Sequence, residues 1–254
     1  MPTAGLRDGI MSVMSAVASS SQQRPGWLID EVANAGRENL DPAHVARYDG
    51  KEDANAAAEV QLLQRVGVGS GSTVVDLGTG TGQLALAVAP HCARVVAVDV
   101  SPVMLRVLRE KIAAAGAVNI DIVEAGFLTY QHSGPPADAV YSRYALHHLP
   151  DAWKAIALVR IHDMLRPGGV FRLQDVVYNF DSQQAEDRIE AWCATGAHGV
   201  VGEWSRAELE DHVRDEHSTF TWLLEPMIAR AGFSVEQADH TADGIFASYV
   251  LRRH

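Results

Sequence analysis

The sequence lacks the features that mark secreted, membrane-spanning and cysteine-ligated metal proteins. It has two cysteines, Cys92 and Cys193, far apart in a chain of 254 residues. This argues against a disulfide framework or a cysteine-based zinc site and favours a reducing, cytoplasmic compartment. No apolar run is long enough to cross a bilayer. The segment 10–18 comes nearest to a signal peptide, but serines interrupt it, so we interpret it as a frayed or helical N-terminus.

Positive charge is also scarce. Against 32 acidic residues stand 21 Lys and Arg, which gives a formal net charge of −11, and the basic residues form no dense run. Such a charge repels phosphate backbones and anionic lipids. We therefore expect a small-molecule partner, with no nucleic acid and no membrane. Whether the chain forms a homodimer is left open.

The hydrophobic pattern predicts an α/β protein. From residue 72, short β-branched runs alternate with helical stretches, which is typical of βαβ units and a parallel sheet. Asp243-Gly244 predicts a hairpin, so the sheet should close with an antiparallel strand. The expected strands are 73–76, 94–99, 120–124, 138–142, 169–175, 233–239 and 245–251, and the expected helices are 27–36, 41–48, 52–66, 82–90, 102–115, 151–165 and 219–231.

Two segments stand apart from this rhythm. We expect residues 1–50 to form an N-terminal helical cap on a core of residues 51–254. Residues 177–217 follow the fifth strand as an insert that contains Trp192 and Trp204, with Trp222 just beyond it. Aromatic side chains there would exclude water from a transfer step. The insert is therefore predicted to be a lid over a largely apolar pocket for a small, planar acceptor.

The segment 74–82 reads Val-Val-Asp-Leu-Gly-Thr-Gly-Thr-Gly and joins a predicted strand to a predicted helix. Glycines in such a turn let the backbone approach a ligand closely. Asp76 precedes them, and a carboxylate there suits an ammonium group better than a pyrophosphate. Gln83 occupies the position where a dinucleotide fingerprint has its third glycine.

Asp99 ends the next predicted strand, where its carboxylate could accept hydrogen bonds from both ribose hydroxyls. A plain structural role as a helix cap is better served by Ser101. A ribose and an ammonium group, with no phosphate required, describe S-adenosylmethionine better than NAD.

From about Tyr48 to its C-terminus, the chain resembles the class I S-adenosylmethionine-dependent methyltransferases, in the small-molecule branch related to ubiquinone-type enzymes. The resemblance is carried by Asp76–Gly82, Val96–Ser101, Tyr144–Asp151 and Met164–Gly169. It implies a Rossmann-like, doubly wound, seven-stranded sheet. It also implies direct displacement of the methyl group from S-adenosylmethionine to an O, N or C nucleophile, with S-adenosylhomocysteine as product. The acceptor is not indicated.

The resemblance assigns cofactor contacts to particular positions. The glycines of the loop would face the methionine portion, and Val100 and Met104 would flank the adenine. Many relatives carry an Asp where this chain has Gly126, so the adenine amino group needs another acceptor here. The full expected set is Tyr48, Asp76, Gly78, Gly80, Asp99, Val100, Met104, Gly126, Phe127, Ser142 and Arg143.

Methyl transfer releases a neutral leaving group, so the protein must supply alignment and, for some acceptors, a base. The candidates are His147 as the base, with His148 as the alternative, and Tyr144 to orient the acceptor. Either histidine could instead pack or cap the helix that follows. No metal site is expected, because the histidines between 198 and 217 lack a ligand spacing.

Alternative functions are left open by these residues. An NAD-dependent oxidoreductase would share the sheet and the ribose acid, but it explains neither Asp76 nor the Arg166–Gly169 turn. A non-catalytic S-adenosylmethionine-binding regulator is compatible with the same motifs. The acidity of the chain disfavours an RNA methyltransferase.

Overall fold

The computed structural model describes residues 25–36, 38–51, 54–196 and 204–254. The segment 10–18, interpreted above as a frayed or helical end, lies outside these residues. Residues 31–254 form one compact unit. Within the described ranges, no helix combines the length and the apolar character that crossing a membrane would need.

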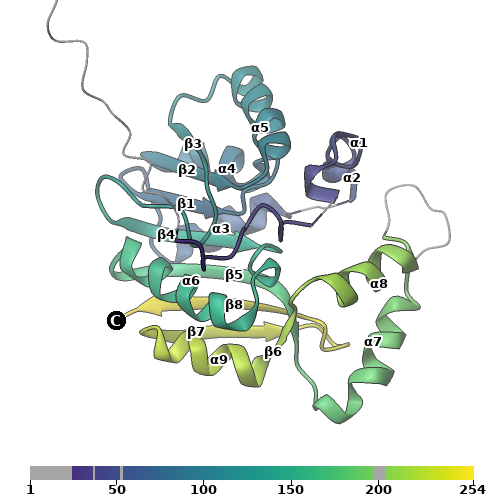
Figure 1. The fold of residues 1–254 in the computed structure, drawn as a ribbon. Helices are drawn as coiled ribbons and strands as arrows, with labels where there is room; N and C mark the ends of the chain where they lie inside the picture. The colour runs from purple at the N-terminus through teal and green to yellow at the C-terminus, as the bar shows by residue number, and fades with distance from the viewer. Residues whose placement is uncertain (1–24, 37, 52–53, 197–203) are drawn as a thin grey trace, which may run out of the picture. The chain divides into compact units, whose positions relative to one another are not determined.

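A mixed sheet forms the centre of this unit (Figure 1). Its strand order is β3-β2-β1-β4-β5-β8-β7, and β6 pairs with β5. The first five strands run parallel, whereas β8 runs antiparallel between β5 and β7. The bounds are β1 (Thr73–Leu77), β2 (Arg94–Asp99), β3 (Ile120–Glu124), β4 (Ala137–Arg143), β5 (Leu165–Tyr178), β6 (Thr219–Phe220), β7 (Phe233–His240) and β8 (Phe246–Arg253). The predicted doubly wound sheet with an antiparallel last strand is confirmed.

Helices cover both faces of the sheet. Figure 1 shows α6 (Asp151–Met164) and α9 (Thr221–Arg230) in front of it and α3 (Ala56–Arg65) and α4 (Gln83–Val88) behind. Every residue of β1 is buried, which explains why its sequence, Thr-Val-Val-Asp-Leu, does not alternate between apolar and polar residues.

Helix α5 (Pro102–Ala115) has the bounds that its sequence predicts, because both of its ends carry strong signals. Ser101 accepts a hydrogen bond from the Met104 amide, and proline follows at the first helical position. Gly116 ends the helix in the left-handed conformation, at φ 65°.

Two local predictions are wrong. Residues 27–36 were expected to be helical, but the described part of the chain has turns there, and α1 (Pro42–Val45) and α2 (Tyr48–Lys51) are the first α-helices within it. The sequence Arg166-Pro167-Gly168-Gly169 was expected to form a turn ahead of the fifth strand. It lies inside β5, where the pairing of β4 with β5 shifts register between Ala137 and Ala139. An irregularity in the ladder therefore accommodates the proline and glycines.

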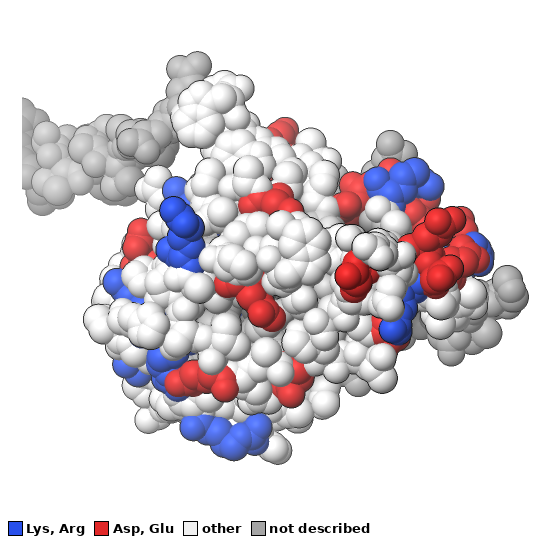
Figure 2. Space-filling view, turned by 90° about the horizontal axis from the view of Figure 1, so that it is seen from below, with Lys and Arg blue, Asp and Glu red and all other residues white. Residues whose placement is uncertain are grey.

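The insert after β5 contains α7 (Ala185–Cys193) and α8 (Arg206–Asp215). Figure 1 shows these helices on the same side of the sheet as α1 and α2. In the space-filling view of Figure 2, acidic side chains gather at the end of the molecule where Figure 1 shows α7 and α8. The acids of these two helices are Glu186, Asp187, Glu190, Glu208, Glu210, Asp211 and Asp215.

Candidate active site

The loop between β1 and α4 adopts the turn that its glycines predict. Gly78, Gly80 and Gly82 have φ angles of 74°, 55° and 82°. A Cβ atom on Gly78 would lie 2.3 Å from the Ala145 Cβ, and one on Gly82 would lie 2.2 Å from the Leu108 Cδ1. These two glycines are therefore required by packing against the protein itself. Gly80 meets nothing closer than 3.7 Å and leaves room for a ligand.

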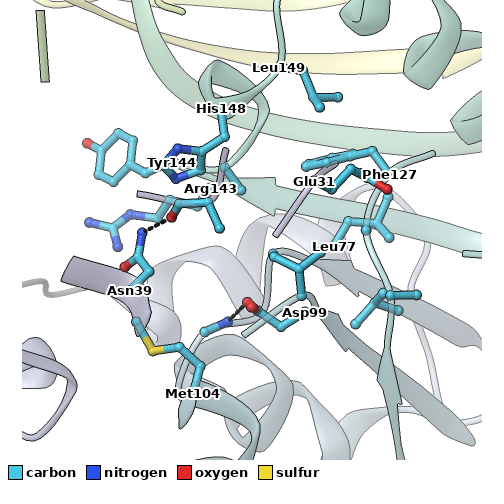
Figure 3. Close-up of a pocket in the computed structure, with 18 of the residues that line it drawn as sticks. Glu31, Asn39, Leu77, Asp99, Met104, Phe127, Arg143, Tyr144, His148 and Leu149 are labelled. Atoms are coloured by element: carbon cyan, nitrogen blue, oxygen red, sulfur yellow. Dashed lines mark hydrogen bonds between the residues drawn. The ribbon is translucent and has the colours of Figure 1, made fainter. Parts of the chain in front are cut away.

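A cavity opens above this loop, at the carboxyl ends of β1, β2 and β4, where the strand order reverses (Figure 3). Figure 3 shows Asp99 and Met104 on one side of it and Tyr144 with His148 on the other. Of the residues expected at the cofactor, those that line the cavity are Tyr48, Gly78, Gly80, Asp99, Val100, Met104, Gly126, Phe127 and Arg143. Asp76 and Ser142 are buried, with 2% and 0% of their surface exposed, and are not among the lining residues.

The two acids near the loop differ in orientation. Asp99 lines the cavity, and its carboxylate accepts hydrogen bonds from the amides of Gly80 and Ser101, both at 2.8 Å. Burial raises the pKa of Asp99. Asp76 instead accepts a 2.7 Å hydrogen bond from the Thr79 hydroxyl, and burial raises the pKa of Asp76 to about 7. Asp76 therefore organises the loop from within, whereas Asp99 is held at the cavity wall.

Glu31 is a cavity residue that the sequence analysis missed. Its carboxylate accepts hydrogen bonds from the Leu128 amide at 3.0 Å and from the Thr129 hydroxyl at 2.9 Å. A Cβ atom on Gly126 would lie 2.2 Å from the Glu31 Oε1. The carboxylate thus occupies the space in which a side chain at position 126 would begin. A distant glutamate facing a glycine gives no local pattern, so sequence spacing could not reveal it.

Asp49 connects α2 to the loop between β1 and α4. Its carboxylate contacts the Thr81 hydroxyl and the Lys111 ammonium group, and it accepts a 3.1 Å hydrogen bond from Gln83 Nε2. Gln83 Oε1 in turn accepts a 2.8 Å hydrogen bond from the Ala54 amide. Gln83, singled out from the sequence as a missing glycine, therefore helps to fix the segment that carries Tyr48 over the loop.

A second cavity, of about 1370 Å³, adjoins the first. The two share Asn39, Tyr48, Arg143, Tyr144 and His148. Tyr144 has a φ of 49°, a conformation that non-glycine residues rarely adopt and that often occurs at functional sites. The Arg143 guanidinium lies 4.3 Å from the centre of the Tyr144 ring.

The insert supplies much of the second cavity's wall. Trp192 and Trp204 line it as expected, but Trp222 is 55% exposed and is not part of the wall. Acids and histidines of the α8 region line it as well: Glu208, Asp211, His212, Asp215 and Glu216. The pocket is therefore more polar than the apolar one that the sequence predicts.

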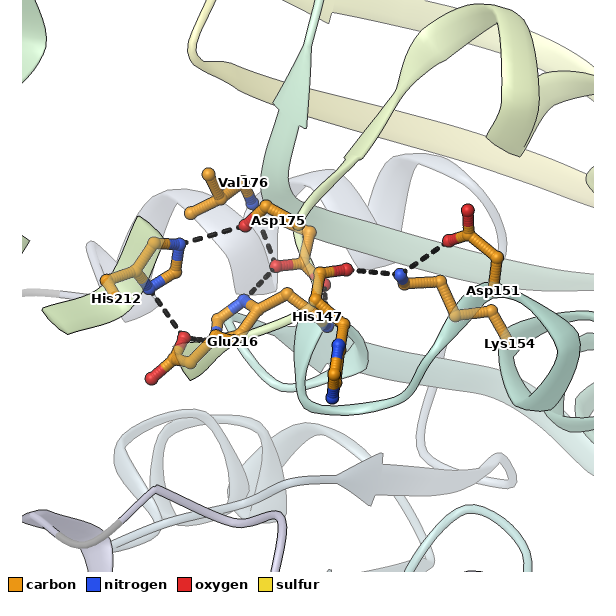
Figure 4. A network of polar contacts seen from close by, with 9 residues as sticks. His147, Asp151, Lys154, Asp175, Val176, His212 and Glu216 are labelled. Atoms are coloured by element: carbon orange, nitrogen blue, oxygen red, sulfur yellow. Dashed lines mark hydrogen bonds and ion pairs between the residues drawn. The ribbon is translucent and has the colours of Figure 1, made fainter. Parts of the chain in front are cut away.

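The tandem histidines have different surroundings, and Figure 4 shows those of His147. His147 is buried, with Nδ1 2.5 Å from Asp175 Oδ1 and Nε2 2.9 Å from Glu216 Oε2. Burial alone would lower the pKa of His147, but the adjacent Asp175 and Glu216 carboxylates raise it to about 10. Burial and the neighbouring His147 charge lower the pKa of His148 to about 3. His147 lines only the second cavity, whereas His148 lines both.

A doubly wound sheet whose glycine loop and strand-end acid meet at the switch point is a Rossmann-like, nucleoside-binding arrangement. Residues 74–169 match a family model described as a methyltransferase domain. An uncharacterized methyltransferase of Geobacillus kaustophilus is 28% identical over 198 residues, or 78% of this chain and 86% of the relative. One of Bacillus subtilis is 26% identical over 166 residues, or 65% of this chain and 71% of the relative.

Solved structures share the fold. A magnesium protoporphyrin IX methyltransferase from Synechocystis, with bound S-adenosylmethionine, superposes with a TM-score of 0.62 at 13% identity, covering 91% of this chain and 100% of that one. A Haemonchus contortus phosphoethanolamine N-methyltransferase in complex with S-adenosylhomocysteine gives 0.65 at 15% identity, covering 89% and 60%. The chain therefore resembles methyltransferases over residues 74–169 and shares its fold with solved S-adenosylmethionine-dependent enzymes.

Proposed function

We propose that this protein binds S-adenosylmethionine in the first cavity and transfers its methyl group to a small molecule in the second. The observation that supports this most directly is the junction of the two cavities. Tyr144 and His148 line both, immediately beyond the β1 loop and Asp99. A methyl group at this junction would face an acceptor without leaving the protein, which is the alignment that direct displacement requires.

In this proposal Asp99 holds the ribose and Gly80 admits the methionine portion. Glu31 provides the carboxylate that Gly126 cannot, next to Phe127 at the adenine edge. Asp76 is proposed to order the loop and not to contact the ammonium group, because its carboxylate is engaged by Thr79.

Around the acceptor, Tyr144 and His148 are placed to contact the molecule that receives the methyl group. His147 lies behind them between two carboxylates, so we assign it a positioning role for His148 and Glu216. The insert helices α7 and α8 are proposed as the lid. Because the wall contains acids and histidines beside two tryptophans, the acceptor should be polar or cationic in part as well as planar. We expect the reaction to take place in the cytoplasm, where the free thiols Cys92 and Cys193 stay reduced.

The test has two arms. Calorimetry with S-adenosylmethionine, S-adenosylhomocysteine and NAD should show binding of the first two and not of NAD. A mass-spectrometric screen of phenols, amines and carboxylic acids should then find a product heavier than its parent compound by the mass of one CH₂ unit. Binding of NAD alone would contradict the cofactor assignment. Tight cofactor binding with no methylated product across the screen would favour the non-catalytic regulator.

A further inference from the structure

A cluster of imidazole and carboxylate groups lies in the wall of the second cavity, apart from the cofactor loop. Ligand atoms of His147, His148 and Glu216 all lie within 4.8 Å of one another. Atoms that share a zinc ion are roughly 3–4 Å apart, because each lies about 2 Å from the metal. Small side-chain rotations would therefore bring these three groups to a common ion.

The polar atoms of this cluster are close together but incompletely paired. Among the described residues, Glu216 Oε2 and His148 Nδ1 are buried and have no hydrogen-bond partner. Yet His147 Nε2 and His212 Nδ1 lie only 2.9 Å and 2.5 Å from that glutamate oxygen. These ion pairs leave Glu216 Oε2 without a hydrogen bond of good geometry, which a buried polar atom usually has.

Residues around the cluster orient its side chains by hydrogen bonds, as residues next to the ligands do in metal sites. His147 directs Nδ1 to the Asp175 carboxylate, leaving Nε2 for a ligand. Asp175 is itself fixed by the amides of His147 and Val176, at 3.1 Å and 2.8 Å. A ligating histidine almost always has its second nitrogen bound to a carboxylate, a carbonyl or water in this way.

The loop that carries Glu216 is also anchored. The His217 amide donates a 2.9 Å hydrogen bond to the His147 carbonyl, and the buried Lys154 ammonium group donates to the His217 carbonyl. Lys154 is held by Asp151 at 2.8 Å (Figure 4). His212 Nε2 lies 2.9 Å from the Ser218 hydroxyl. Three separate segments of the chain are thus fixed around the same point.

We propose that His147, His148 and Glu216 form a binding site for one divalent transition-metal ion such as zinc. Two imidazoles and one carboxylate are donors that suit zinc, whereas magnesium and calcium take oxygen-rich sets. Three protein ligands leave a coordination position open, and both His148 and Glu216 line the second cavity. An acceptor with a hydroxyl or carboxylate group could bind there, and the ion would lower the pKa of a bound hydroxyl.

The test measures metal binding alone, so it depends on neither cofactor nor acceptor. Untagged protein is stripped with a chelator and titrated with Co²⁺, whose visible absorption reports a site of low coordination number. We expect a single saturating equivalent that Zn²⁺ displaces, confirmed by elemental analysis. Glu216→Gln and His148→Ala should abolish that equivalent. Asp175→Asn should weaken it by about 10–100-fold, as loss of an outer carboxylate does.

The matched control is His91→Ala, which removes an exposed histidine far along the chain from the cluster and should bind Co²⁺ like the wild type. Thermal unfolding of each variant establishes that it is folded. Wild-type protein that takes up no stoichiometric Co²⁺ or Zn²⁺ would overturn the proposal, and so would retention of full affinity by both Glu216→Gln and His148→Ala. Methylation in fully metal-free protein at the normal rate would leave the proposed function intact and restrict the ion to a structural role.

Discussion

The two adjoining cavities are encoded in different ways. The first is built from short contiguous motifs. The loop after β1 supplies Gly78 and Gly80, the end of β2 supplies Asp99, and the first turn of α5 supplies Met104. The second draws His147, Val176 and Glu216 from three separate parts of the chain, and residues of α7 and α8 line it as well. If the first cavity holds the cofactor and the second the acceptor, as we propose, the cofactor is bound by residues of local motifs and the acceptor by side chains from distant parts of the chain.

The difference extends to electrostatics. The Asp99 carboxylate accepts hydrogen bonds from two backbone amides, those of Gly80 in the β1–α4 loop and Ser101 just after β2. His147 lies buried between two carboxylates that are far away in the sequence. Removing one member of such a buried pair leaves an uncompensated charge, so the second cavity should be the more sensitive of the two to substitution.

The largest effect is therefore expected at His147. His147→Ala should lower kcat by about 10²-fold, the upper end of the range for loss of a group that positions active-site side chains, while the Kd for S-adenosylhomocysteine changes little. Single-turnover kinetics and calorimetry measure the two quantities separately. His162→Ala, at the end of α6, is the control. A variant with normal kcat would mean that the second cavity does not serve the reaction.

The first cavity is tested by Asp99. Asp99→Ala should weaken binding of S-adenosylmethionine by about 1.5–3 kcal/mol, the usual loss for hydrogen bonds to a charged group, which is about 10–150-fold in Kd. The fold should persist, because the side chain lies at the tip of β2. Calorimetry against Asp121→Ala, an exposed acid of β3, provides the comparison. Equal affinities would return Asp99 to a purely structural role.

Sequence reasoning succeeded where the information is local. The bounds of α5 follow from Ser101, Pro102 and Gly116 because each acts within one turn of the helix. The central parallel strands β1, β2 and β4 follow from largely apolar runs that are buried on both faces. The expected residues that line the first cavity follow from the same cause, since most of them belong to a strand end or the turn after it.

It failed where contacts are set by the tertiary fold. The sequence places Glu31 in a segment expected to be helical, and nothing near it points to Gly126. The histidines of the insert showed no ligand spacing because the ring that His212 contacts belongs to His147, which lies on η3 (Leu146–His148). The expectation of an apolar acceptor pocket weighed the tryptophans and overlooked Glu216, whose neighbours only the folded chain reveals.

A smaller effect on cofactor binding is expected at Glu31, where a pair of substitutions gives a more specific test. Glu31→Ala should weaken cofactor binding by about 1 kcal/mol, the net contribution of a typical hydrogen bond. Gly126→Asp alone should also weaken it, because the new side chain would begin 2.2 Å from the Glu31 carboxylate. The double variant should bind nearly as tightly as the wild type, since one carboxylate then replaces the other.

This pair forms a double-mutant cycle in which each change repairs the other. Glu124→Ala, an exposed acid two residues before Gly126, is the control and should have no effect. Calorimetry with S-adenosylhomocysteine gives all the affinities. Additive losses in the double variant would show that Glu31 does not substitute for a side chain at position 126.

The smallest effect on ligand binding is expected at Asp76, where the consequence should be one of stability. Its pKa is about 7 in the folded protein against 3.8 for the free side chain, because burial disfavours the carboxylate. A raised folded-state pKa stabilises the protein fully below about pH 4, and this contribution is lost as the pH rises towards about 7. Asp76→Asn cannot ionise, so its melting temperature should fall less between pH 5 and pH 8 than that of the wild type. Asp121→Asn, at an exposed ion pair with Arg94, should keep the wild-type difference. If Asp76→Asn instead weakened S-adenosylmethionine binding more than Asp99→Ala, the carboxylate would face the ligand as the sequence predicts, and its contact with Thr79 would open when the cofactor binds.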